Sequence, residues 1–232
     1  MSASLASIIL PVHNQADHIG AVVTEYVDAL ARTEQPYELI LVPNACRDGS
    51  VAVCQELADR HSEVRVVASD RSGWGLAVKL GLENARGELL GYTNSARTSG
   101  PDLLLLLLYA RVYPQIVVKA NRKIRESWRR RLGSLLYNLQ CRALFDLSNW
   151  DINGTPKFFP RSFSKLLSLT RTDDLIDAEF SLVCRRENYP MLEVPIFSTR
   201  RHGGRSTMNL RAAVRLYWGA YELSREAKRS AS

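Results

Sequence analysis

The first hundred residues alternate between short apolar runs and longer segments with helical spacing. The apolar runs are continuous, which is typical of strands that are buried on both faces of a parallel sheet. Between them, apolar side chains recur every three or four residues, which predicts helices with one buried face. This alternation predicts βαβ units and a mostly parallel α/β sheet flanked by helices. The predicted strands span 7–12, 38–42, 64–68 and 88–92, and the predicted helices span 16–30, 50–61 (capped by Ser50) and 75–85.

The rest of the chain is less regular but contains the same kinds of element. We find no internal repeat, low-complexity stretch or clear linker in it. We therefore expect one domain over residues 1–232, with a functional division near residue 100. The predicted strands of this part span 115–119, 157–160 and 191–197, and the predicted helices span 101–112, 122–144, 161–169, 177–188 and 207–230.

The composition indicates a globular protein with a basic surface. Apolar residues make up 46% of the chain, the net charge is +7, and the isoelectric point is about 9.4. A positive balance favours anionic partners such as nucleotides, phospholipid headgroups or nucleic acid, or it simply keeps the surface soluble. The basic run NRKIRESWRRR comes with no nucleic-acid-binding motif, so we expect no nucleic-acid partner.

The signals for cellular location favour the cytoplasm. Four scattered cysteines, Cys46, Cys54, Cys141 and Cys184, lack the spacing of zinc sites or disulfide frameworks, which favours a reducing compartment. The N-terminal residues do not resemble a signal peptide, and no window reaches the roughly 18 apolar residues of a membrane span. The amphipathic segment 207–230 predicts either peripheral contact with the inner membrane face or packing on its own domain or on a second subunit, as in a homo-oligomer.

Polar loops follow the first four predicted strands. Their sequences are HNQAD, PNACRDGS, SDRSGWG and TNSARTSGP. Because the carboxyl ends of parallel strands lie at one edge of a sheet, we expect these loops to form the functional site. The fourth loop has no carboxylate between Tyr92 and Pro101, which is unusual for a site that would bind a metal ion.

Six segments resemble, in order and spacing, the motifs of inverting family 2 glycosyltransferases. They are PVHNQADHI, VPNACRDGS, GWGLAVKLGLENARGELLGY, KANRKIRESWRRRLGS, DINGTPKFFPRSF and DAEFSLVCRRENYPMLEVPIFSTRRHGGRSTMN. Within that family, the sequence is most similar to the dolichyl-phosphate mannose synthase-like, polyprenyl-phosphate branch. The resemblance implies the GT-A (nucleotide-diphospho-sugar transferase) fold, with a nucleotide-sugar-binding half over 1–100 and an acceptor-side half over 101–232. It also implies inverting transfer of a sugar to a polyprenyl phosphate or a small hydroxyl compound.

The chain departs from the family where the family binds a divalent cation. The D-x-D motif falls on Asn94-Ser95-Ala96, the first-loop Glu is Gln15, and the second-loop Asp is Asn44. Hard cations prefer several oxygen ligands, mostly carboxylates. We therefore predict no metal site, no required cofactor, and transfer with weak or no metal dependence.

Two accounts explain this loss of acids. In the first, cationic side chains neutralise the leaving diphosphate in place of a metal. This account assigns Arg122 to catalysis, Arg97 to the donor, and Arg131, Arg201 and Arg205 to the acceptor phosphate. In the second account, the fold survives as a non-catalytic module that binds a sugar nucleotide or a partner enzyme.

The resemblance places several further residues near the donor. Asp48 either contacts the nucleotide or caps the helix that starts near Ser50. Asn44 would pair with a base ring N–H through its amide oxygen, and His13 occupies the position beside the donor. The remaining predicted donor contacts are Pro11, Asn14, Gly75, Lys79 and Asn94.

One carboxylate matches the family position for a base or acceptor contact. Transfer to a hydroxyl needs a general base, whereas an attacking phosphate is already anionic. Asp177 aligns with the family D-x-E box, so we predict that it is catalytic; alternatively, it caps its helix or pairs with an arginine. We expect Glu179 to point elsewhere, because it lies two positions further along the helix. Asp151 is expected to hold a basic residue in place.

Overall fold

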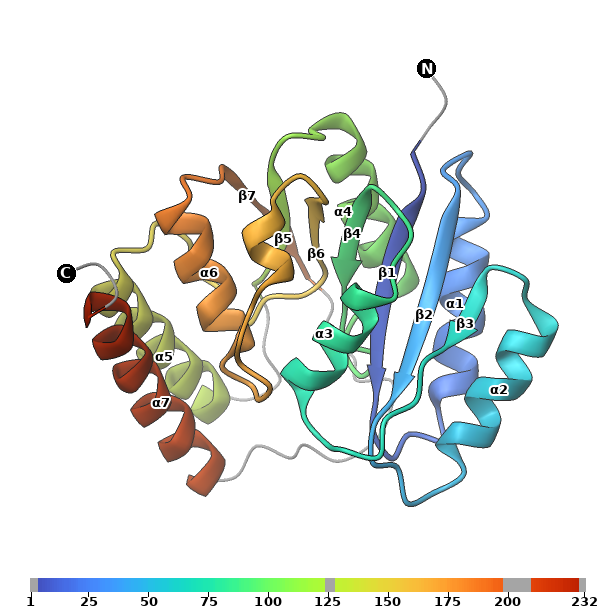
Figure 1. Ribbon diagram of the computed structural model, residues 1–232, viewed down its shortest axis with the longest axis horizontal. Coiled ribbons are helices and arrows are strands. Elements are labelled where there is room, and N and C mark those ends of the chain that lie inside the picture. Colours follow the sequence, from blue (N-terminus) through green and yellow to red (C-terminus); the bar gives the residue numbers. More distant parts are fainter. Residues whose placement is uncertain (1–3, 124–127, 198–209, 230–232) are drawn as a thin grey trace.

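The computed structural model describes residues 4–123, 128–197 and 210–229, without side chains at 128–131 and 210–213. The described residues form a seven-stranded sheet in the order β3-β2-β1-β4-β6-β5-β7 (Figure 1). Strands β1–β4 are parallel, and β6 is antiparallel to both β4 and β5. The strands are β1 (Ala6–Val12), β2 (Tyr37–Pro43), β3 (Val64–Val66), β4 (Leu89–Tyr92), β5 (Val117–Arg122), β6 (Lys157–Pro160) and β7 (Met191–Ile196).

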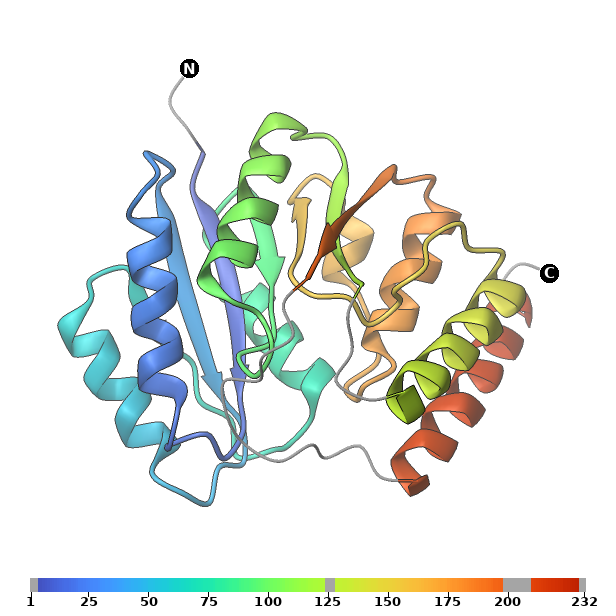
Figure 2. The same ribbon diagram turned by 180° about the vertical axis from the view of Figure 1, so that it is seen from behind.

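Helices cover both faces of the sheet, because successive residues of each strand point to opposite sides. On β1, Ile8 packs with α1, α2 and α4, whereas Ile9 packs with α3, the short 3₁₀ helix η1 and α6. A third cluster joins α5 and α7 to the outer side of α6 (Figures 1 and 2). The helices are α1 (Ile19–Leu30), α2 (Ser50–Arg60), α3 (Trp74–Glu83), α4 (Gly100–Val112), α5 (Trp128–Phe145), α6 (Ile176–Arg186) and α7 (Leu210–Arg229), and η1 spans Ser164–Leu167.

The predicted fold class is confirmed, and the differences lie at element ends. The first helix begins at Ile19 rather than near residue 16, because 15–18 forms a turn closed by the Gln15 carbonyl. Strand β5 extends to Arg122, beyond the predicted 115–119, because it pairs with β7 along this whole length. The predicted helix over 161–169 is reduced to η1, and residues 207–209 and 230 of the last predicted helix lie outside the described residues.

Ser50 is not the cap that the sequence predicts for α2. The N-cap position is Gly49, and Ser50 is the first helical residue. Its hydroxyl donates to Asp48 and accepts from the backbone N–H of Gln15. The helix start is therefore bound to the loop after β1, and this places α2 beside the carboxyl edge of the sheet.

Candidate active site

Three loops meet at the carboxyl edge of β1, β2 and β4, at the bottom of Figure 1. We call them the edge loops: 13–18, 44–49 and 93–99. Two side chains of the first loop bind the second. His13 Nδ1 lies 2.6 Å from the Asn44 carbonyl oxygen, so this nitrogen carries the proton and donates it. The Asn14 side-chain oxygen accepts the backbone N–H of Arg47 at 2.8 Å. Both His13 and Asn14 are exposed at this edge, as a donor site requires.

The Asn44 side chain holds the backbone of its neighbours. It is only 4% exposed, and its amide nitrogen donates to the carbonyls of Val12 (2.8 Å) and Val42 (3.3 Å). Its amide oxygen accepts the backbone N–H of Gly73 at 3.2 Å. The oxygen that was expected to meet a nucleotide base is thus directed at the chain itself in this structure.

Asp48 caps the turn that leads into α2. Its carboxylate accepts the backbone N–H groups of Ala16 and Ser50, each at 3.0 Å, as well as the Ser50 hydroxyl. Partial desolvation opposes ionisation, but the hydrogen bonds from Ser50 and Ala16 outweigh it and lower the Asp48 pKa. Asp48 therefore binds the first backbone N–H of α2, although the N-cap position itself is Gly49, and contact with a nucleotide stays a prediction.

The third edge loop contains residues 94–96, and the Asn94 and Ser95 side chains are directed at the protein. The Asn94 side-chain oxygen accepts the backbone N–H of Ala96 at 2.9 Å. The Ser95 hydroxyl donates to the Gln15 side chain at 2.6 Å, and Ala96 is buried. These residues provide no carboxylate and do not fit a divalent-cation site. No group of three His, Cys, Asp or Glu side chains that could hold a metal ion occurs among the described residues.

Glycine at 75 lets α3 approach the 170–173 segment closely. A Cβ atom there would lie 2.7 Å from the Arg171 carbonyl oxygen and 2.8 Å from that of Asp173. The Glu179 carboxylate accepts the backbone N–H groups of Thr170 and Arg171, so it points at this segment. Gly75 thus contacts the protein's own backbone, and so does Lys79, whose Nζ donates to the Thr170 carbonyl at 3.3 Å.

The second half of the chain contributes a buried set of charges, which we call the ionic cluster. It comprises Lys119, Arg122, Asp151, Lys157, Asp177 and Glu193. The Arg122 guanidinium binds both carboxylate oxygens of Asp151, with Nε–Oδ2 and Nη2–Oδ1 distances of 2.8 and 2.9 Å. Burial lowers the Arg122 pKa, but Asp151 more than compensates and the net shift is upward, with a further contribution from nearby Asp177. As expected from the sequence, Asp151 holds a basic residue in place.

Lys119 and Glu193 form the second pair of the cluster. The Lys119 ammonium is fully buried and donates to Glu193 at 2.9 Å and to the Asp151 carbonyl. Glu193 also accepts the backbone N–H of Trp150 at 3.0 Å. Burial opposes ionisation of Glu193, but these partners lower its pKa. The charge of Lys119 is therefore balanced inside the protein.

Lys157 is the site-adjacent residue that the sequence analysis missed. It opens β6, is 0% exposed, and forms an ion pair with Asp177, which also accepts the Tyr92 hydroxyl at 2.8 Å. Burial lowers the Lys157 pKa to about 8, and Asp177 opposes that shift. Asp177 therefore pairs with a lysine rather than with the arginine considered from the sequence, and it links Tyr92, the last residue of β4, to the start of α6. The apolar strand KFFP indicates that Lys157 borders the core, but its partner is not evident in the sequence.

The structure brings only part of the predicted set together. His13, Asn14, Asn44 and Asp48 converge in the edge loops, and Arg122 and Asp177 meet in the ionic cluster. Two other predicted residues lie near the edge loops: Pro11 is in β1, and Arg97 is half-buried in the third edge loop. Arg201, Arg205 and the side chain of Arg131 lie outside the described residues.

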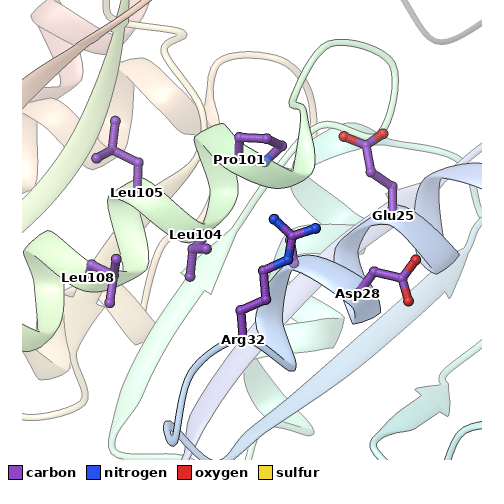
Figure 3. Close-up of a pocket in the computed structure, with 8 residues that line it drawn as sticks. Glu25, Asp28, Arg32, Pro101, Leu104, Leu105 and Leu108 are labelled. Atoms are coloured by element: carbon purple, nitrogen blue, oxygen red, sulfur yellow. The ribbon is translucent and has the colours of Figure 1, made fainter.

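A concave region elsewhere is separate from these residues. A groove of about 430 Å³ lies between α1 and α4, and Figure 3 shows its lining. The α1 side carries Glu25, Asp28 and Arg32, and the α4 side carries leucines. No predicted site residue lines this groove.

Solved structures of low sequence identity share the fold. The structure superposes on glucosyl-3-phosphoglycerate synthase from Mycobacterium tuberculosis, solved with Mn²⁺, UDP-glucose and phosphoglyceric acid, with a TM-score of 0.72 and 18% identity over 95% of this chain and 79% of that one. It also superposes on mannosyl-3-phosphoglycerate synthase from Rubrobacter xylanophilus, with a TM-score of 0.68 and 18% identity over 99% and 75% of the two chains. The predicted GT-A fold is therefore confirmed.

Curated relatives are glycosyltransferases of greater length. The undecaprenyl-phosphate 4-deoxy-4-formamido-L-arabinose transferase of Aeromonas hydrophila is 28% identical over 58% of this chain and 42% of its own. The cholesterol galactosyltransferase of Borreliella burgdorferi is 23% identical over 78% of this chain and 48% of its own. The matched region is thus less than half of either relative. Residues 7–166 match the profile of Glycosyl transferase family 2, and the chain belongs to that family.

Proposed function

We propose that the protein is an inverting glycosyltransferase that moves a sugar from a nucleotide donor to a polyprenyl phosphate, with weak or no dependence on a metal ion. Three features support this proposal. The chain belongs to a glycosyltransferase family, several relatives are named as undecaprenyl-phosphate sugar transferases, and the edge loops lie where nucleotides bind in such sheets. Residues 101–232 carry 23 lysines and arginines against 12 aspartates and glutamates, a balance that favours two phosphate-bearing substrates.

The observation that carries the metal-independent part is the placement of Arg122. The third edge loop offers a divalent cation no carboxylate, whereas Arg122 ends β5 as a cation fixed by both oxygens of Asp151. A charge that is held in place before the reaction stabilises a developing negative charge without reorganising. We infer that Arg122 faces the leaving diphosphate and that Asp151 is its positioning residue.

The reaction follows from these roles. An oxygen of the acceptor phosphate attacks the anomeric carbon from the side opposite the nucleoside diphosphate. The new C–O bond forms as the bond to the diphosphate breaks, the configuration at that carbon inverts, and the electron pair leaves on the diphosphate. The attacking phosphate has no proton to lose, so a general base is not needed. Asp177 then acts by holding Lys157 and Tyr92 beside the edge loops.

A transfer assay with a lipid acceptor tests the proposal. Purified protein is incubated with a panel of nucleotide sugars and undecaprenyl phosphate, and glycolipid formation is measured. We expect one donor to give product and Arg122→Ala to lower kcat by about a hundredfold, the usual scale for removing one electrostatic contact to a transition state. The matched control is Arg185→Ala, which removes an arginine from an exposed pair with Asp146.

Other outcomes would overturn parts of the proposal. Nucleotide binding without turnover across the whole panel would instead favour a non-catalytic homologue. Equal activity of Arg122→Ala and Arg185→Ala would remove Arg122 from catalysis. Salt-sensitive retention of oligonucleotides that a nucleotide sugar fails to displace would indicate a nucleic-acid binder.

A further inference from the structure

Helices α5 and α7 carry apolar side chains that do not contribute to the core. Among the side chains of these two helices that the structure describes, seven large apolar ones are more than a third exposed. Their spacing places them on the outward side of each helix, three or four residues apart. We call this set the α5–α7 face: Leu132, Leu135, Leu136 and Leu139 on α5, and Val214, Trp218 and Tyr221 on α7.

The two helices lie side by side, so their apolar rows form one surface. The Tyr217 hydroxyl donates to the Gly133 carbonyl at 2.7 Å, and the Gln140 side chain donates to the Tyr217 carbonyl at 2.9 Å. Figures 1 and 2 show the same parallel arrangement from both sides. The opposite sides of the helices are already used, because Cys141 and Leu216 pack in the cluster with α6.

Folding alone does not account for this face. Exposed apolar residues are normally scattered singly, and a contiguous apolar patch marks a surface that contacts another molecule. From Leu132 to Leu139, α5 carries no charged side chain. Trp218 is 62% exposed, and tryptophan is a side chain that is enriched at membrane–water interfaces.

The charges around the face are mostly positive. The exposed charged side chains described on α7 are four basic and two acidic: Arg215, Arg225, Lys228 and Arg229 against Glu222 and Glu226. One of the acids, Glu226, is paired with Arg171. An apolar row with basic residues nearby matches an anionic lipid surface, because the apolar side chains fit the acyl chains and the basic side chains fit the headgroups.

Helix α4 also exposes apolar side chains, but acids outnumber bases among the charged residues of the groove beside it. Leu105 and Leu108 line this groove together with Glu25, Asp28 and Arg32, as Figure 3 shows. Val112, on the same helix, is 68% exposed. Acidic neighbours disfavour contact with an anionic bilayer. A substitution on α4 therefore tests whether any exposed apolar residue, with or without basic neighbours, contributes to vesicle binding.

We propose that the α5–α7 face lies on an anionic phospholipid bilayer, with its leucines, Val214 and Trp218 among the outermost acyl carbons and the basic residues of α7 at the headgroups. This inference deepens the proposed function and rests on it for its biological purpose. The amino-terminal ends of α5 and α7 lie on the same side of the molecule as the carboxyl ends of β1 and β2 (Figures 1 and 2). A lipid-borne phosphate would therefore reach the edge loops from this bilayer.

Vesicle flotation tests the proposal without donor or acceptor, so its result does not depend on catalysis. The protein is mixed with vesicles of phosphatidylcholine and phosphatidylglycerol, or of phosphatidylcholine alone, both lacking undecaprenyl phosphate. We expect binding to the mixed vesicles and several-fold weaker binding to the neutral ones. Val214→Glu should lower the partition coefficient about tenfold, which corresponds to losing one buried aliphatic side chain. Val112→Glu, at a valine of similar exposure on α4, should bind like the wild type.

Folding and self-association are measured on the same proteins. Circular dichroism melting checks that Val214→Glu and Val112→Glu remain folded, and a second variant, Leu136→Glu, repeats the test on α5. Equal flotation of Val214→Glu, Leu136→Glu and Val112→Glu would overturn the proposal. A wild-type dimer that Val214→Glu converts to a monomer, with no binding to vesicles, would also overturn it and assign the face to a second copy. Flotation without any glycosyl transfer would support the bilayer contact and count only against the proposed function.

Discussion

In the edge loops, neutral amides and hydroxyls hold the backbone together with the Asp48 carboxylate, whereas in the second half of the chain buried charges hold one another. Asn44 and Asn94 both use their side chains on nearby backbone groups. Lys119, Arg122 and Lys157 each meet a carboxylate in the ionic cluster. The third edge loop has no carboxylate, while the ionic cluster contains three carboxylates paired with three cations.

This difference assigns distinct tasks to the two halves. A loop without carboxylates, such as 93–99, does not repel a diphosphate and offers a metal ion no carboxylate ligand. A buried, paired cation is fixed in position but costs desolvation, so it is sensitive to the loss of its partner. We therefore expect variants in the ionic cluster to have large effects on stability. When an acid replaces an amide in the edge loops, we expect the change in stability to depend on whether that amide donates or accepts hydrogen bonds.

The largest effect is expected at Asp177. Asp177→Ala leaves the buried Lys157 without its carboxylate, which should lower the free energy of unfolding by about 3–5 kcal/mol. Urea unfolding at pH 7 measures it. The control, Arg185→Ala, breaks an exposed pair with Asp146 and should cost about 1 kcal/mol or less. Adding Lys157→Met to Asp177→Ala should restore most of the loss, and equal effects of Asp177→Ala and Arg185→Ala would contradict the buried pair.

The pH dependence of that variant has a definite sign. Burial already lowers the Lys157 pKa to about 8, and Asp177 keeps it from falling further. Without Asp177, the folded variant binds no proton at Lys157 near neutral pH, whereas its unfolded state does. Stability rises with pH where the unfolded state binds more protons, so the gap to the wild type should narrow as pH rises towards 8. A gap that widens over this range would count against the assignment.

A smaller effect is expected when an acid replaces an amide side chain that donates hydrogen bonds. Asn44→Asp replaces an N–H donor with a carboxylate facing the carbonyls of Val12 and Val42. Losing these hydrogen bonds should cost about 1–3 kcal/mol at pH 7. Differential scanning calorimetry at pH 7 would show the change as a lower melting temperature.

The matched control replaces, with an acid, an amide side chain that accepts a hydrogen bond. The Gln15 side-chain oxygen receives the Ser95 hydroxyl, and a glutamate oxygen does the same. Gln15→Glu should therefore change stability by no more than about 0.5 kcal/mol. If Gln15→Glu proved as destabilising as Asn44→Asp, hydrogen-bond direction would not explain the edge loops.

The sequence predicts the fold well because the information is local. Continuous apolar runs and helical periodicity define β1 to β4 and α1 to α4 to within a few residues. The position of β6, inserted antiparallel between β4 and β5, depends on pairing between segments that are distant in the chain. Periodicity contains no information about such pairing.

The candidate site is predictable to a similar degree. The loop positions and the missing carboxylates at 94–96 are evident in the sequence, as is a partner for Asp151. Two features are not evident in the sequence: the hydrogen bonds from the Asn44 side chain to backbone carbonyls, and the Lys157–Asp177 pair. Both depend on burial in the folded structure. A side chain's partners become known only when the strands are placed side by side.

The most direct test of the central claim is the rate of sugar transfer to undecaprenyl phosphate in excess EDTA, compared with the rate in Mn²⁺ or Mg²⁺. The account predicts that the wild-type rate changes less than about twofold between these conditions, because side chains neutralise the diphosphate. Transfer that requires Mn²⁺ or Mg²⁺ and stops in EDTA would contradict it.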